Sequence, residues 1–136
     1  MLDSATRSKI VDELFDVYET RRPLRRLTGT YPGLTVEDSY LVQEEFVRRK
    51  VDAGAKVKGY KVGLTSKPMQ EMAGSSEPDF SAITDDMFLP EATPSDASRF
   101  FRPMIEIEIA FVMKHALKWP GVLPVDVIRA TDFVVP

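Results

Sequence analysis

The sequence predicts an α+β fold in which helices precede strands. Apolar residues recur with helical spacing in two early segments, residues 4–20 and 35–54. Later runs are rich in β-branched residues and are typical of strands, at residues 57–64, 104–112 and 132–136. The character changes after Gly54, so we expect a helical segment over residues 1–56 and a β-rich segment over residues 57–136.

Length and composition limit the classes of protein to consider. The 136 residues suffice for one domain or slightly more, and a net charge of -3 makes nucleic acid an unexpected partner. Cysteine is absent from the sequence, which excludes disulfides and thiolate metal sites and fits a cytoplasmic location. We also expect no membrane association, because no apolar run reaches the length of a membrane span.

The first helix is expected over residues 4–20, with Ser4 as its cap. Ile10, Leu14 and Val17 fall at i, i+4 and i+7, so they form one apolar stripe. Four arginines follow this helix and form a solvated turn or a contact for an acidic partner: Arg21, Arg22, Arg25 and Arg26.

A loop is expected over residues 28–33, because Gly29 and the pair Pro32-Gly33 are turn signals. The second helix then begins with a capping box, in which Thr35 is the cap and Asp38 stands at the third helical position. It ends at Gly54.

The segment 57–64 is expected to be a strand interrupted by two glycines, which often mark a bulge or a close approach of backbone to another group. Lys61 lies between Tyr60 and Val62. It is an ordinary edge-strand lysine, or a half-buried ammonium that needs an anionic partner and can transfer protons. The sequence alone leaves both interpretations open.

A short helix is expected from Ser66 to Gly74, with Pro68 in its first turn. Residues 75–80 then form a loop that contains Asp79, which is a turn residue or a catalytic carboxylate. Residues 84–89 are a short strand or turn.

Glu106 and Glu108 lie two residues apart in the predicted strand 104–112, on the face opposite three isoleucines. Their Cα atoms would be about 6.5–7 Å apart, from a rise of about 3.3 Å per residue. Two converging carboxylates are half of a site for a hard ion such as Mg²⁺. The same pattern also fits a strand with a solvated polar face.

The last part of the chain is expected to be a loop over residues 114–122, then a short helix from Pro124 to Ala130 and a final strand. The loop holds His115, which we interpret as a surface residue because no nucleophile motif accompanies it, and Trp119.

Five motifs occur in an order that resembles one enzyme family. They are GYKVGLTSK at 59–67, EPDF at 77–80, DMF at 86–88, IEIEIAFV at 105–112 and ATDFVVP at 130–136. This order is similar to that of the hydratase/decarboxylase family of aromatic meta-cleavage pathways, in the fumarylacetoacetate hydrolase superfamily. The resemblance begins near Leu14 and is greatest to the branch that hydrates 2-oxo-hept-4-ene-1,7-dioate.

The resemblance implies a helical segment followed by a mixed, barrel-like catalytic domain, of which this chain would be the N-terminal half. It assigns Lys61 and Asp79 to catalysis and Glu106 and Glu108 to the metal, Mg²⁺ or Mn²⁺. The family's third metal carboxylate belongs to a P-A-L-E-type run that would begin at Pro136, so it is missing here.

The implied reaction is the metal-dependent addition of water to a 2-hydroxy-dienoate or its 2-oxo tautomer. The alternatives are a decarboxylase of the 4-oxalocrotonate type, a more distant acylpyruvate hydrolase, and an inactive or partner-dependent fragment. We further expect a homo-oligomer, and we expect the isolated chain to associate through its unfinished sheet.

Overall fold

The computed structural model describes residues 1–118 and 120–136 and confirms the α+β class. The chain forms two compact units, Met1–Phe101 and Arg102–Pro136. The predicted division between residues 56 and 57 is a different one and stays a prediction. Trp119, expected in a loop, lies outside the described residues.

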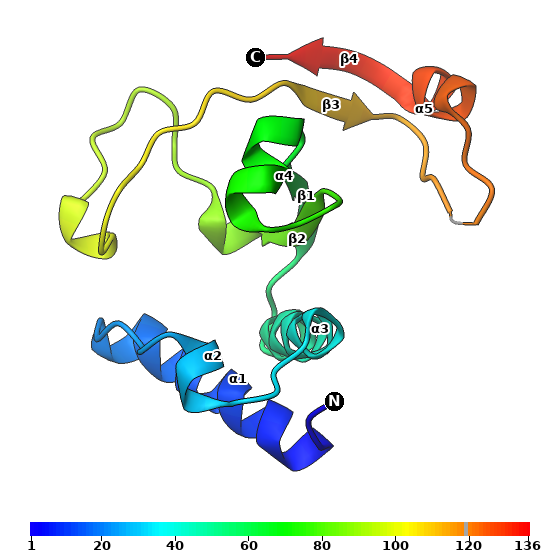
Figure 1. The fold of residues 1–136 in the computed structure, drawn as a ribbon. Coiled ribbons are helices and arrows are strands. Elements are labelled where there is room, and N and C mark those ends of the chain that lie inside the picture. Colours follow the sequence, from blue (N-terminus) through cyan, green and yellow to red (C-terminus); the bar gives the residue numbers. More distant parts are fainter. Residues whose placement is uncertain (119) are drawn as a thin grey trace. The chain divides into compact units, whose positions relative to one another are not determined.

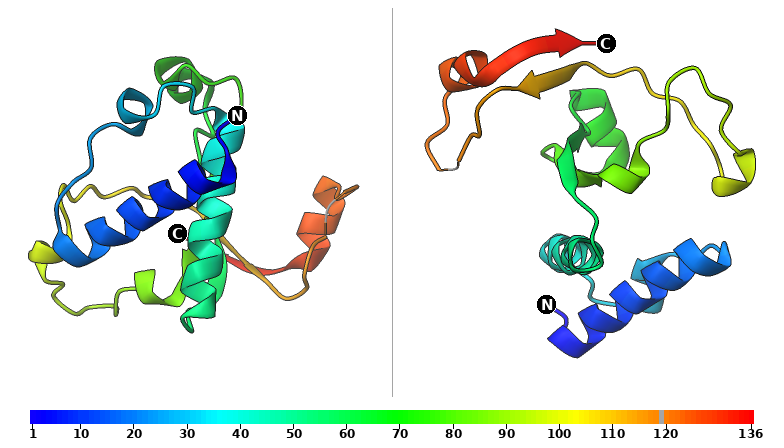
Figure 2. Two further views of the ribbon diagram at one scale, coloured as in Figure 1. Left: turned by 90° about the horizontal axis from the view of Figure 1, so that it is seen from below. Right: turned by 180° about the vertical axis from the view of Figure 1, so that it is seen from behind.

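Two long helices form the core of the first unit, α1 (Ser4–Thr20) and α3 (Val36–Asp52), and they cross one another (Figures 1 and 2). Their apolar stripes meet at three buried side chains, Ile10, Val11 and Val42. Both predicted helices are therefore confirmed. The predicted cap of α1 is wrong by one residue, because the Asp3 side chain accepts a hydrogen bond from the Thr6 N–H and starts the helix.

The loop expected over residues 28–33 contains a single helical turn, α2 (Leu27–Thr30). Gly29 and two threonines disfavour a helix locally. Leu27, however, packs against the α1–α3 core, and this tertiary contact outweighs the local preference.

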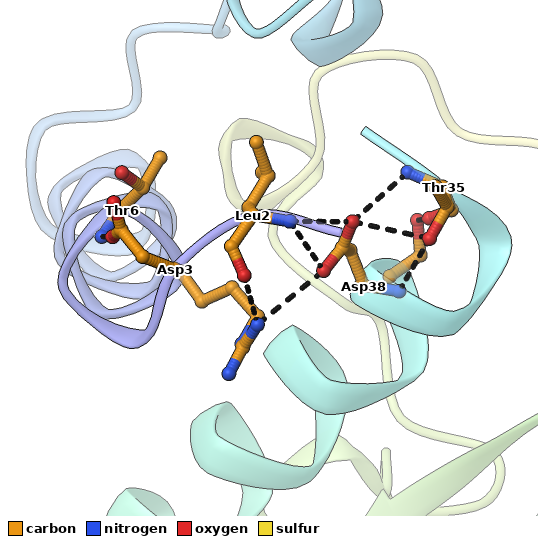
Figure 3. Close-up of polar contacts among 7 residues, drawn as sticks. Leu2, Asp3, Thr6, Thr35 and Asp38 are labelled. Atoms are coloured by element: carbon orange, nitrogen blue, oxygen red, sulfur yellow. Dashed lines mark hydrogen bonds and ion pairs between the residues drawn. The ribbon is translucent and has the colours of Figure 1, made fainter. Parts of the chain in front are cut away.

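Asp38 ties the N-terminus to the start of α3 (Figure 3). Its buried carboxylate accepts hydrogen bonds from the Leu2 N–H, at 3.0 Å, and from the Thr35 N–H, at 3.2 Å. The Thr35 hydroxyl in turn accepts from the Asp38 N–H, which completes the predicted capping box. Burial alone would raise the pKa of Asp38, but these donors outweigh it and hold that pKa below its usual range.

A two-stranded antiparallel ribbon follows the helices. It consists of β1 (Val57–Gly63) and β2 (Asp79–Thr84), with α4 (Lys67–Ala73) in the connection. The strand β1 and the helix α4 were both predicted. The loop expected over residues 75–80 is wrong at its end, because Asp79 already pairs with Gly63 and opens β2. Residues 85–87 form a short turn of 3-10 helix, η1 (Asp85–Met87).

The end of β2 is attached to the helices by an ion pair. The Lys50 ammonium on α3 is almost buried and lies 2.7 Å from the Asp86 carboxylate. Next to this pair, the Lys56 N–H donates to the Asp85 side chain at 2.9 Å, and the Asp85 N–H donates to the Lys56 carbonyl. A second turn, η2 (Ala97–Arg99), ends the unit.

The second unit contains β3 (Ala110–Met113), α5 (Pro124–Ala130) and β4 (Thr131–Val135), and the two strands pair antiparallel. The helix and the final strand were predicted. The strand expected over residues 104–112 is wrong for its first part, because only residues from Ala110 onward pair. β4 offers pairing partners for Ala110–Met113 alone, and an extended segment without a partner strand does not form a ladder.

The described strands form two separate two-stranded sheets, β1–β2 and β3–β4, and no closed barrel. Across residues 1–118 and 120–136, no helix has the length and apolar character needed to cross a membrane.

Candidate active site

The β1–β2 register brings two predicted site residues to one face of the ribbon. Lys61 pairs with Ser81, and Gly63 pairs with Asp79. Residues opposite one another, and residues two apart on a strand, share a face, so Lys61 and Asp79 are diagonal neighbours on it. Lys61 is half-buried, whereas Asp79 is exposed. An ammonium and a carboxylate on one face are suited to proton transfer.

Gly63 leaves the space that the Asp79 carboxylate occupies. A Cβ built at Gly63 would overlap Asp79 Oδ1, so any other residue here would displace the carboxylate. The expectation that a glycine in this strand marks a close approach is thus confirmed at Gly63. At Gly59 a Cβ would meet nothing within 4 Å, but the β1–β2 register shifts between Val57 and Gly59, so the bulge that a strand glycine can mark lies there.

One face of α3 forms the wall of a cleft above this part of the ribbon. The cleft has a volume of about 340 Å³. Lys61 and Asp79 line it from the ribbon, and the helix residues that line it recur at i, i+3, i+4 and i+7: Val36, Ser39, Tyr40 and Gln43. Such a volume accommodates a small acid and is in the usual range of small-molecule sites.

Aromatic stacking joins this wall to the ribbon. The rings of Tyr40 on α3 and Phe80 on β2 are stacked with centroids 5.1 Å apart. Tyr60 meets the same Phe80 ring edge-on at 6.4 Å. The floor of the cleft is therefore packed against the helix by rings adjacent in sequence to Lys61 and Asp79.

Two glutamine side chains hold the main chain at the same end of the ribbon. Gln43 Nε2 donates to the Phe80 carbonyl at 3.1 Å, and Gln70 Nε2 donates to the Leu64 carbonyl at 2.8 Å. Leu64 has a φ of 53°, a left-handed conformation that is uncommon for a bulky residue. Gln70 is 4% exposed, and its Oε1 accepts a hydrogen bond from Lys67 Nζ at 3.0 Å, so the whole amide is held in place.

Glu106 and Glu108 lie in the second unit, on an extended segment that precedes β3, and both are exposed. Their carboxylate oxygens are the ligands that a hard divalent cation prefers, so their chemistry fits the predicted metal. Among residues 1–118 and 120–136, no group of three or more His, Asp or Glu side chains gathers that could hold a metal ion.

The α3 wall was not among the site residues predicted from the sequence. Val36, Ser39, Tyr40 and Gln43 have the spacing of one helix face, and this signal was visible. What the spacing could not show is which face of α3 turns toward the ribbon, because that depends on how the helix packs.

The chain matches several curated enzymes, in each case over only part of the enzyme's length. It is 42% identical over 136 residues to 2-oxo-hept-4-ene-1,7-dioate hydratase of Escherichia coli, covering 100% of this chain and 51% of that protein. It is 40% identical over 111 residues to 4-oxalocrotonate decarboxylase of Pseudomonas sp. strain CF600, covering 82% of this chain and 42% of that protein. The chain thus spans about half the length of the curated relatives it matches, and no family model matches it.

A solved structure shows the same fold. The 4-oxalocrotonate decarboxylase of Pseudomonas putida G7, complexed with magnesium and adipate, superimposes with a TM-score of 0.93 at 32% sequence identity. The match covers 100% of this chain and 52% of the decarboxylase. A second structure of that enzyme is complexed with calcium and acetate.

Proposed function

Because this chain is a relative of meta-cleavage hydratases and of 4-oxalocrotonate decarboxylases over about half of their length, we propose that it carries part of a metal-dependent hydratase site. The substrate is a 2-hydroxy-dienoate or its 2-oxo tautomer, and 2-oxo-hept-4-ene-1,7-dioate is the first candidate. The observation that carries this proposal is the cleft, in which Lys61 and Asp79 share one ribbon face.

In the proposed reaction the chain's own residues stabilise negative charge and transfer protons. A proton first moves from C3 to C5 of the 2-oxo-4-enoate, which gives the 2-oxo-3-enoate. The water oxygen then bonds to C4, the distal carbon of the double bond that is now conjugated with the 2-oxo group. Negative charge then moves to the 2-oxygen, where the Lys61 ammonium stabilises it. Asp79 accepts the proton of the attacking water or orients Lys61. A proton returned to carbon completes the addition.

Glu106 and Glu108 would hold the divalent cation, Mg²⁺ or Mn²⁺. When bound, the cation supplies Lewis acidity toward the oxygens of a 2-oxo acid. Magnesium and calcium in the structures of the P. putida decarboxylase support a divalent cation in this role. In this proposal residues 1–56 supply the helical wall, and residues 57–136 belong to the barrel-like catalytic domain of a homo-oligomer.

The proposal is tested by following dienoate ultraviolet absorbance with the chain, first with Mg²⁺ and then with EDTA. We expect a metal-dependent decay that yields the hydroxylated 2-oxo acid. Glu106→Gln should weaken metal binding, whereas Glu44→Gln, an exposed change on α3, should not. Equal metal affinity in wild type and Glu106→Gln would contradict the ligand assignment.

The second candidate function is decarboxylation, which the structural match at a TM-score of 0.93 favours. It needs the same stabilisation of charge on the 2-oxygen but releases CO₂ in place of adding water. Release of CO₂ without formation of the hydroxylated product would identify the reaction as decarboxylation. Absence of any decay would favour the third possibility, a chain that needs a partner to complete its metal ligands.

A further inference from the structure

Gln43 and Gln70 contact the ribbon on either side of a single residue pair. Gln43 binds the carbonyl of Phe80, which follows Asp79, and Gln70 binds the carbonyl of Leu64, which follows Gly63. Gly63 and Asp79 pair with one another in the ladder. The two amides therefore fix both strands at the end of the ribbon where the Asp79 carboxylate lies.

This end of the ribbon requires such restraint for two reasons. The Asp79 carboxylate occupies the space beside Gly63, so a small shift of either strand moves it. Leu64 is held in a left-handed conformation, at φ 53°, which costs free energy and persists only where surrounding contacts enforce it. A buried Gln70 bound to the Leu64 carbonyl is such a contact.

We propose that Gln43 and Gln70 are positioning residues, which fix the Gly63–Asp79 end of the ribbon and thereby the Asp79 carboxylate relative to Lys61. The proposal rests on the proposed function for its catalytic consequence. Its structural part, the control of the Asp79 side chain by two distant amides, stands on the hydrogen bonds alone. Neither glutamine is assigned contact with substrate or metal.

The test uses Gln43→Met and Gln70→Met, which keep side-chain length but remove the N–H donor. A matched control is Ser8→Ala, which removes the 2.9 Å tertiary hydrogen bond between Ser8 and Glu45 of α3. Residues 43 and 45 are about 200° apart around a helix, so the control leaves the cleft wall intact. Gln43→Glu is a second variant, isosteric and lacking the donor, in case the methionine variant fails to fold.

The first readout is the ¹³C NMR spectrum of the full chain with labelled carbonyl and carboxyl carbons. We expect the Asp79 carboxyl resonance to shift or broaden in both methionine variants and to stay unchanged in Ser8→Ala. Loss of the Phe80 or Leu64 carbonyl hydrogen bond with an unchanged Asp79 resonance would overturn the proposal. This readout does not depend on turnover.

The second readout is dienoate decay. In an active chain both methionine variants should lower kcat by about 10-fold to 100-fold, because misplacement of a catalytic group is costly, with KM nearly constant. Equal kcat in wild type and both variants would overturn the positioning role. If the wild-type chain shows no decay, the proposed function fails by itself, and the Asp79 resonance alone decides the inference.

Discussion

Replacing Lys50 by methionine removes the cation that joins α3 to the end of β2. The side chain is 9% exposed, and its ammonium lies 2.7 Å from Asp86 Oδ2 and within 5.8 Å of the centroids of two aromatic rings, Tyr18 and Phe46. A hydrogen bond between charged groups contributes about 1.5–3 kcal/mol. Because the Asp86 side chain is 51% exposed, solvent reduces this value, and we expect about 1–2 kcal/mol for the pair.

A double-mutant cycle isolates that contribution. Lys50→Met, Asp86→Asn and the double variant are unfolded in urea, with far-UV circular dichroism as the probe. The cation–π contacts are lost in Lys50→Met but kept in Asp86→Asn, so they cancel in the coupling term. A coupling free energy below about 0.3 kcal/mol would refute the reasoning, because residues that do not interact show deviations from additivity of this size.

The pH dependence gives an independent check on the same pair. The hydrogen bond from the Lys50 ammonium lowers the pKa of Asp86 from its usual value of 3.8. A lowered folded-state pKa means that the ionised carboxylate stabilises the fold above pH 3.8, and that this stabilisation is lost as the pH falls through the lowered value. The coupling should therefore be constant near neutral pH and disappear at the acidic end of the titration.

Three further changes test other parts of the structure. Ile10→Ala should lower the free energy of unfolding by about 2–5 kcal/mol, because the side chain is fully buried, whereas Val36→Ala on the surface of α3 should change it by less than about 0.5 kcal/mol; equal urea midpoints would contradict the core assignment. Asp38→Asn should lower the melting temperature at neutral pH, and the difference should shrink as the pH falls below 3.8 because the folded-state pKa of Asp38 is lowered; a constant difference would contradict it. Ile107→Lys should reduce self-association seen by light scattering, since Ile107 is a large apolar side chain that is 94% exposed; a monodisperse wild type at tens of micromolar would contradict it.

Signals that lie within a few residues predicted the local structure well. The Thr35 and Asp38 pair forms the capping box that the sequence indicates, because both partners are three residues apart on the same turn. Pro68 stands in the first turn of α4, and Gly74 ends that helix with a φ of 69°. Each of these features is decided by local geometry, so no knowledge of the rest of the chain is required.

Predictions that depend on strand pairing were wrong in two ways: a strand was missed at residues 79–80, and a strand was predicted too early, before Ala110. Asp79 and Phe80 follow a proline and look like a loop, yet the ladder with β1 makes them the start of β2. Ile105, Ile107 and Ile109 alternate as a strand should, yet β4 pairs only from Ala110 onward. Strand propensity describes a fit to a neighbouring strand, and the sequence does not show where that neighbour lies.

The two pairs of candidate site residues also differ in whether their proximity depends on strand pairing. Glu106 and Glu108 are two residues apart on an extended segment, so their carboxylates can approach one cation whether or not that segment pairs. Lys61 and Asp79 are 18 positions apart, and they share a face only because Gly63 pairs with Asp79 in the β1–β2 register. A slip of one residue would turn Asp79 to the opposite face of the ribbon. Whatever fixes that register therefore also fixes the proton-transfer pair, and the amides of Gln43 and Gln70 contact the ribbon at the end where this pairing begins.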